Sequence, residues 1–193
     1  NGIVGAGGAG FPTYAKLDER ADIILMNCAE CEPLLKLHRQ LLEQNAEVIL
    51  KAFDMIAEAV GAKEAVIGIK KEYKATLRAI DRYIDSYSRM RVQLLDSAYP
   101  MGDEVVLIYE ATGRVIRPGG LPIEEGVAVF NVETVYNTYR ALELGIPVVD
   151  KVVSIVGEVE HPVTVRVPIG ALVRDVVAYG GEILAKNPVY LMG

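Results

Sequence analysis

The feature that most constrains the fold is an alternation of short apolar runs with longer amphipathic segments. Four apolar runs, each bounded by polar residues or glycine, are typical of buried strands: residues 23–26, 65–69, 92–95 and 126–130. Four segments space their apolar side chains at helical intervals: residues 37–60, 72–88, 104–112 and 131–144. Strands that alternate with helices predict an α/β protein with a Rossmann-like parallel sheet and helices on both faces.

The pattern changes after Pro147. Residues 149–157 and 163–167 are expected to be strands around a turn, and a short helix is expected near residues 171–178. The order strand, strand, helix is the opening of a β-grasp unit. We therefore predict two domains, residues 1–147 and residues 148–193. The chain starts at Asn1 without a methionine and ends without a helix cap, so we expect a piece of a longer protein with its second domain truncated.

Composition excludes several classes of protein. Hydrophobic residues make up 51% of the chain and charged residues 24%, which is typical of a folded protein. The net charge of −6 argues against nucleic-acid binding. No apolar run approaches the roughly 20 residues of a membrane span. Two cysteines and no export signal favour a cytoplasmic protein without disulfides.

The chain opens with a glycine-rich run, Gly-Ala-Gly-Gly-Ala-Gly at residues 5–10, followed by Phe11, Pro12 and a Thr13 expected to cap a helix over residues 14–20. A run almost without side chains exposes backbone N–H groups, which bind phosphate. No strand precedes the run and no Gly-Lys-Ser/Thr closes it, so it is neither the dinucleotide fingerprint nor a P-loop. The alternative to a phosphate site is a flexible terminus.

Three polar clusters follow predicted strands, at residues 27–32, 99–104 and 131–134. Because ligands of parallel sheets bind at the carboxyl ends of the strands, we expect the clusters on one side of the sheet. Asparagine can hydrogen-bond a phosphate or a ring edge, and a carboxylate can accept from sugar hydroxyls. Two structural alternatives stay open: Asn131 can cap the following helix, and so can the acids at 103–104.

Cys28 and Cys31 form a Cys-x-x-Cys pair. Zinc and iron–sulfur sites need about four ligands, and His38 and His161 are isolated in the sequence. We therefore predict no metal in this chain and leave the role of the pair open. The sequence also offers no Ser/His/Asp set and no case for paired catalytic carboxylates. That lack of catalytic side chains is typical of a protein whose chemistry belongs to a cofactor.

The four clusters, in this order and spacing, resemble the flavin-carrying, NADH-oxidising subunit of respiratory complex I. The motifs are Gly-x-Gly-Gly-Ala-Gly-Phe-Pro-Thr, Asn-x-x-Glu-x-Glu-Pro, Tyr-x-x-Gly-Asp-Glu and Asn-Val-Glu-Thr. The segments at residues 107–114 and 119–122 resemble a closer branch. That branch is the RnfC-like family of the Rnf electron-transport complex with its soluble relatives, among them microcompartment cobalamin reductase and a protein associated with proline reductase.

The resemblance implies FMN on the Rossmann-like domain, followed by a ubiquitin-like β-grasp domain of the SLBB type. It implies an FMN site and a neighbouring NADH site. The FMN site would comprise Gly5, Gly7, Gly8, Ala9, Gly10, Lys16, Asn27, Glu30, Tyr99, Gly102, Asn131 and Thr134. The NADH site would comprise Phe11, Glu32 and Glu104. The chain departs from complex I at Ala6, Ala29 and Met101, where that family has Arg, Asp and Cys, which bears on NADH affinity more than on flavin binding.

The resemblance further implies an electron-transfer flavoprotein subunit that takes hydride from NADH, or the reverse. Electrons would pass to 4Fe–4S clusters in a part of the protein beyond this chain, with other electron-transfer subunits or a reductase as partners. The expected location is cytoplasmic, with the inner face of the cell membrane as an alternative. The open alternatives for function are an electron carrier for cobalamin or proline reductase and a non-catalytic docking module.

Overall fold

The computed structural model of the chain describes residues 1–7, 10–32 and 34–191. It forms two compact units. The first comprises residues 1–31 and 38–148, and the second comprises residues 32–37 and 149–193. The predicted division into residues 1–147 and 148–193 did not include residues 32–37 with the second part and stays a prediction.

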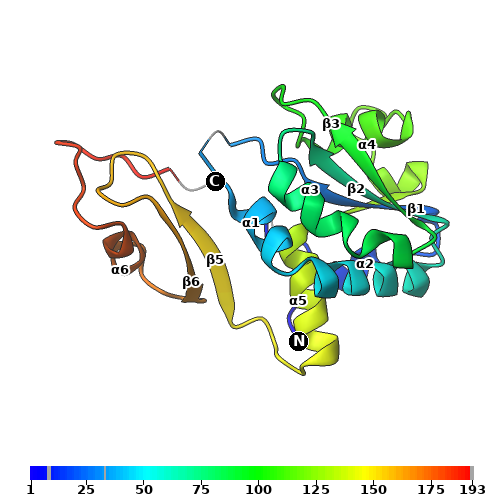
Figure 1. Cartoon of the computed structure of the whole chain (residues 1–193), viewed down its shortest axis with the longest axis horizontal. Helices are drawn as coiled ribbons and strands as arrows, with labels where there is room; N and C mark the ends of the chain where they lie inside the picture. The colour runs from blue at the N-terminus through cyan, green and yellow to red at the C-terminus, as the bar shows by residue number, and fades with distance from the viewer. Residues whose placement is uncertain (8–9, 33, 192–193) are drawn as a thin grey trace. The chain divides into compact units, whose positions relative to one another are not determined.

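The first unit is built on a four-stranded parallel sheet with the strand order β3-β2-β1-β4 (Figure 1). The strands are β1 (Ile23–Cys28), β2 (Glu64–Lys70), β3 (Met90–Leu95) and β4 (Val127–Asn131). The register places Asn27 of β1 between Gly68 of β2 and Asn131 of β4. The predicted strands and their parallel arrangement are confirmed.

Helices cover both faces of this sheet, as predicted. They are α1 (Leu37–Gln44), α2 (Ala46–Val60), α3 (Lys74–Asp81), α4 (Glu104–Thr112) and α5 (Val132–Glu143), with short 3-10 helices at Thr13–Lys16, Ile84–Ser86 and Pro122–Glu125. Side chains alternate along β1: Ile24 and Met26 face a core shared with α1, α2, α3 and α5, whereas Ile23 and Leu25 face a core shared with α4. This alternation is what a strand buried on both faces requires.

Helix α4 packs a leucine against the sheet at Gly68. A Cβ atom on Gly68 would lie 2.5 Å from Leu107 Cδ1, so a larger residue there would force the Leu107 side chain to move. The predicted bounds of α4 are correct, and its ends have clear causes. Asp103 accepts hydrogen bonds from the N–H groups of Val105 and Val106, and Gly113 ends the helix with a φ of 73°.

Three helix predictions were wrong in detail. Residues 37–60 form two helices, because Asn45 has a non-helical backbone and its side chain donates to the Leu41 carbonyl. Residues 72–88 are helical only as far as Asp81, and the chain then tightens into a 3-10 turn. The helix predicted over residues 14–20 is a single 3-10 turn, Thr13–Lys16. Thr13 is the first residue of that turn and not its cap, and no side chain caps it.

The second unit contains an antiparallel pair, β5 (Asp150–Ile155) and β6 (Val163–Pro168). The short helix α6 (Val173–Val177) follows, and a 3-10 turn occupies Ala178–Gly180. Ile155 and Val167 are buried between them. The predicted strand, strand, helix order is present, but a β-grasp fold needs more strands than this pair, so that assignment stays a prediction. Within residues 1–7, 10–32 and 34–191, no helix is long and apolar enough to cross a membrane.

Candidate cofactor site

The carboxyl ends of β1 and β4 lie side by side, and each carries an asparagine. Asn131 is the last residue of β4 and also the N-cap of α5, because its Oδ1 accepts a hydrogen bond from the Thr134 N–H at 2.8 Å. The Thr134 hydroxyl lies 2.8 Å from the same Oδ1 atom. The capping role considered for Asn131 is therefore present, and the cap sits at the edge where parallel sheets bind ligands.

The glycine-rich loop is anchored on this start of α5. The Ala6 N–H donates to Thr134 Oγ1 at 3.0 Å, and the same hydroxyl lies 3.2 Å from the Val4 carbonyl oxygen. The loop is closed at its base, where the Gly5 N–H donates to the Phe11 carbonyl at 2.8 Å. The Thr134 hydroxyl thus links the loop to a residue that lies 128 positions further along the sequence.

Gly7 lies in tight surroundings, where a side chain would press on its neighbours. A Cβ atom at Gly7 would lie 3.0 Å from Asn131 Nδ2 and 3.2 Å from His38 Cε1. Further along the loop, Gly10 has a φ of 69°, a conformation that favours glycine. Gly8 and Ala9, both predicted to contact FMN, lie outside the described residues. The loop therefore brings bare backbone close to the polar end of β4.

The segment at residues 99–104 is held against the loop that follows β1. Asn27 Nδ2 donates to the Gly102 carbonyl at 2.8 Å, and the Gly102 N–H donates to Cys31 Sγ at 3.0 Å. A Cβ atom at Gly102 would lie 1.9 Å from the Ala29 carbonyl oxygen, so only glycine fits. Tyr99, at the start of the same segment, is 83% exposed. Two of the three clusters predicted to converge are thus in direct contact.

Lys16 supplies a positive charge at the end of β4. Its Nζ donates to the Val129 carbonyl at 2.8 Å and lies 3.8 Å from Glu104 Oε1. The same ammonium lies 6.0 Å from the centroid of the Phe11 ring, which is 52% exposed. Lys16, which lies near Phe11 in the opening segment, therefore also lies near Glu104 at the start of α4.

Glu30 is buried behind this edge. Its Oε1 accepts from the His38 N–H at 2.9 Å, and its Oε2 lies 3.9 Å from Arg39 Nε. The Arg39 guanidinium lies 4.4 Å from the centroid of the Tyr73 ring, and burial raises the pKa of Tyr73 to about 12. Glu30 was predicted as a site residue. His38 and Arg39 were not, because nothing in their local sequence marks them.

Lys70 was also missed. It is the last residue of β2, it is buried, and its Nζ donates to the Glu30 carbonyl at 2.5 Å. The available signal was its position, since Lys70 directly follows the apolar run at residues 65–69. Glu32, predicted to contact NADH, belongs to the second compact unit and is not placed relative to the residues above.

The two cysteines differ in their surroundings. Cys28 is fully buried at the end of β1, and burial raises the pKa of its thiol, which keeps it protonated. Cys31 is partly exposed and accepts the Gly102 N–H. In the described part of the chain, no group of three or more His, Cys, Asp and Glu side chains could hold a metal ion.

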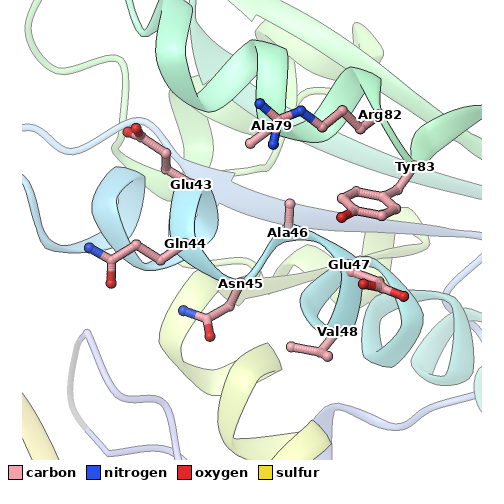
Figure 2. A pocket seen from close by; sticks show the side chains of 9 residues that line it. All are labelled: Glu43, Gln44, Asn45, Ala46, Glu47, Val48, Ala79, Arg82 and Tyr83. Atoms are coloured by element: carbon pink, nitrogen blue, oxygen red, sulfur yellow. The ribbon is translucent and has the colours of Figure 1, made fainter.

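A separate pocket lies at the junction of α1 with α2 (Figure 2). Figure 2 shows its lining, which consists of residues 43–48 together with Ala79, Arg82 and Tyr83 from the end of α3. Glu43 and Glu47 place two carboxylates around it. It shares no lining residue with the predicted cofactor site.

The residues at the carboxyl edge fit a phosphorylated cofactor. Backbone N–H groups of a glycine loop and the N-terminus of α5 favour an anion, and Lys16 adds charge nearby. The Thr13 hydroxyl is buried in the same opening segment and has no hydrogen-bond partner among the described residues. These features define a parallel α/β domain whose carboxyl edge is suited to a phosphate-bearing ligand.

The chain belongs to the family described as the Nuo51 FMN-binding domain, which matches residues 1–140. The resemblance to this family and to its RnfC-like branch, stated from the motifs, is thereby confirmed. The expected FMN rests on this family membership. The roles of individual residues stay predictions.

The relatives belong to the predicted branches. Cobalamin reductase PduS of Salmonella typhimurium is 41% identical over 192 residues, covering 100% of this chain and 42% of that protein. One component of the Na(+)-translocating ferredoxin:NAD(+) oxidoreductase complex of Acetobacterium woodii is 33% identical, covering 91% of this chain and 41% of that protein. A crystal structure of an NAD+-reducing [NiFe]-hydrogenase in the H2-reduced state matches with a TM-score of 0.77 and 27% identity, covering 93% of this chain and 37% of that one. The chain thus spans about two fifths of the length of these curated relatives.

Proposed function

We propose that this chain is the flavin-carrying part of an electron-transfer subunit, with FMN at the carboxyl edge of β1 and β4 and NAD(H) beside it. The observation that carries the proposal is the contact of the glycine loop with the start of α5, through Ala6 N–H, Gly7 and Thr134 Oγ1. Bound FMN would supply the redox chemistry, exchanging a hydride with the nicotinamide and passing on single electrons.

The chain's own residues would bind and orient. The backbone of Gly5, Gly7, Gly8, Ala9 and Gly10 would lie against the phosphate and the ring, and Lys16 would neutralise phosphate charge. Asn131 and Thr134 would bind the phosphate at the helix start. Asn27 and Glu30 would hold the polar edge and ribityl chain, with Tyr99 and Gly102 shaping the wall. Phe11, Glu32 and Glu104 would contact the dinucleotide.

The FMN half can be tested by titrating the purified chain with FMN and following the quenching of flavin fluorescence. Thr134→Val removes the hydroxyl that anchors the loop and is expected to weaken FMN binding by about tenfold or more. Thr138→Val is the matched control, since Thr138 lies one turn further along α5 and donates to the Thr134 carbonyl. No FMN binding by the unaltered chain, or equal losses in both variants, would contradict the proposal.

The NADH half has its own test. The FMN-loaded chain is expected to lose its visible flavin absorbance when NADH is added without oxygen. Phe11→Ala should raise the NADH concentration needed and leave FMN affinity unchanged, because the bond that closes the glycine loop uses the Phe11 backbone carbonyl and not its ring. Flavin that stays oxidised under NADH would leave an FMN-binding domain without the dinucleotide function.

A second candidate concerns the electron acceptor. The 41% identity to a protein named as a cobalamin reductase favours a corrinoid acceptor for the longer protein, and the Rnf-type relatives favour ferredoxin. Either route would use 4Fe–4S clusters outside this chain and a reductase or electron-transfer partner, on the cytoplasmic side of the cell. Comparing NADH-driven reduction of cob(II)alamin and of ferredoxin by the full-length protein would separate the two. A docking module would bind its partner equally well without flavin.

A further inference from the structure

A buried lysine lies behind the candidate site and has no part in the proposed function. Lys70 is only 8% exposed. Lysine is almost never fully buried unless it is paired, so its partner matters. Its Nζ donates to the Glu30 carbonyl at 2.5 Å and lies 6.0 Å from the centroid of the Tyr73 ring. Burying an ammonium group costs free energy of folding, so we expect this lysine to serve a role in its buried position.

What Lys70 holds is the loop that follows β1. Its ammonium fixes the Glu30 backbone, while the Glu30 carboxylate is fixed separately by the His38 N–H and lies near Arg39. Glu30 is thus restrained at both its main chain and its side chain. These restraints come from β2, which carries Lys70, and from α1, which carries His38 and Arg39.

That loop in turn holds the segment with Gly102. The Ala29 carbonyl is the atom that a Cβ at Gly102 would strike, and Cys31 Sγ accepts the Gly102 N–H. Both neighbours of Glu30 therefore contact the segment that forms one wall of the site. A displacement of the Glu30 carbonyl would move Ala29 and Cys31 together, because each is joined to Glu30 by one peptide.

We infer that Lys70 is a positioning residue for the FMN site, whose ammonium sets the place of the loop at residues 28–31 and, through it, of Gly102. The inference rests on the proposed function, because it assigns Lys70 a role in the same FMN site. The inference predicts that loss of the Lys70 ammonium lowers FMN affinity more than it lowers the stability of the fold. Removing the ammonium costs the hydrogen bond to the Glu30 carbonyl but also removes the cost of burying the charge, so the two changes in stability oppose each other while the loop loses its restraint.

The test compares three variants of the full chain by FMN titration and by thermal denaturation without FMN. Lys70→Met is expected to weaken FMN binding by about tenfold or more while the midpoint of unfolding changes little, because the lost hydrogen bond and the removed burial cost oppose each other. Lys70→Arg keeps a charged donor and should recover binding to within about threefold of the unaltered chain. Lys71→Met is the matched control, an exposed neighbour paired with Asp96, and should change neither quantity.

Several outcomes would overturn the inference. They are FMN binding by Lys70→Met equal to that of the unaltered chain, failure of Lys70→Arg to recover binding, and a binding loss that matches a loss of stability. Should Lys70→Met not fold, Lys70→Gln, which keeps a neutral donor, carries the same comparison. If the unaltered chain binds no FMN, the proposed function itself fails, an outcome distinct from normal binding in the variant.

Discussion

Charged side chains have different hydrogen-bond partners at the two ends of the parallel sheet. At the amino end, Asp22 and Arg114 form a two-point ion pair with distances of 2.5 and 2.9 Å, and Arg114 also donates to the Glu125 carbonyl at 2.7 Å. At the carboxyl end, Lys16 and Lys70 donate to neutral backbone carbonyls. The ion pairs at the carboxyl end are longer, with 3.8 Å between Lys16 Nζ and Glu104 Oε1 and 3.9 Å between Arg39 Nε and Glu30 Oε2.

Under the proposed function, the amino end is a structural edge and the carboxyl end is the binding edge. A closed ion pair leaves little field for a ligand, while ammonium groups on carbonyl oxygens keep their positive potential, which the N-terminus of α5 reinforces. An anionic cofactor would meet that potential only at the carboxyl end. Changes at the amino end should therefore affect stability alone, and changes at the carboxyl end should affect binding as well.

The largest effect is expected from Gly102→Ala. The new Cβ would lie 1.9 Å from the Ala29 carbonyl, so the loop or the segment must move, and we expect a loss of about 2 kcal/mol or more of unfolding free energy together with FMN affinity. Chemical denaturation and FMN titration measure the two. Gly5→Ala is the stability control, since its Cβ would make an ordinary contact 3.6 Å from the Phe11 nitrogen. Equal stability in both variants would mean that the carboxyl edge is not tightly built.

At the amino end, Arg114→Met should remove the ion pair and the bond to Glu125, costing about 1–3 kcal/mol of stability. FMN affinity should remain unchanged, because Arg114 lies at the opposite end of the sheet. Arg117→Met is the control, as its contact with Glu124 is 3.4 Å long and exposed. A clear loss of FMN affinity in Arg114→Met would break the distinction between the edges.

Two substitutions of Asn131 can distinguish its role as the N-cap of α5 from its proposed role in binding the FMN phosphate. Asn131→Ala should cost about 1 kcal/mol, because the N-cap of α5 is lost, whereas Asn131→Asp keeps a capping oxygen and should be nearly as stable as the original. The added negative charge should nevertheless weaken FMN binding by about tenfold. Asp103→Asn, the corresponding exchange at the cap of α4, should leave both stability and FMN binding nearly unchanged. FMN binding by Asn131→Asp as tight as in the original chain would contradict a contact between Asn131 and the FMN phosphate.

The smallest effect concerns pH. The hydrogen bond from Arg114 lowers the pKa of Asp22 below its ordinary value of 3.8. The carboxylate therefore contributes stability that is complete above about pH 4 and is lost as the pH falls through the lowered folded-state pKa. Both side chains are partly exposed, so we expect less than about 1 kcal/mol. Urea denaturation over this acidic range should show a steeper loss in the original chain than in Arg114→Met; identical slopes would contradict it.

Much of the fold was predictable because its signals are local. The apolar runs gave the strands, and Asp103 with Gly113 marked both ends of α4. The break at Asn45 was missed because the apolar spacing continues across it, and only the bond from its side chain to the Leu41 carbonyl interrupts the helix. The β-grasp assignment went beyond what two strands can establish.

The candidate site divides in the same way. The rule for carboxyl ends correctly predicted that Asn27, Gly102 and Asn131 lie at one edge. Arg39 could not be found by that rule, because it lies on α1 and not at a strand end. Lys70 ends β2 at the same edge, but its burial comes from tertiary packing that the local sequence does not show. The FMN and NADH roles of the residues came from the resemblance, and they await the titrations above.

The junction of β4 with α5 has a consequence of its own. Asn131 ends the strand and caps the helix, so no linker separates the two elements. Each added residue would turn the helix by about 100° and shift it by about 1.5 Å. A single insertion after Asn131 would rotate Thr134 away from the Ala6 amide and would release the opening loop. The helical phase of α5 is thus locked to the sheet, and sequence change at this point can proceed by substitution but not by a change of length.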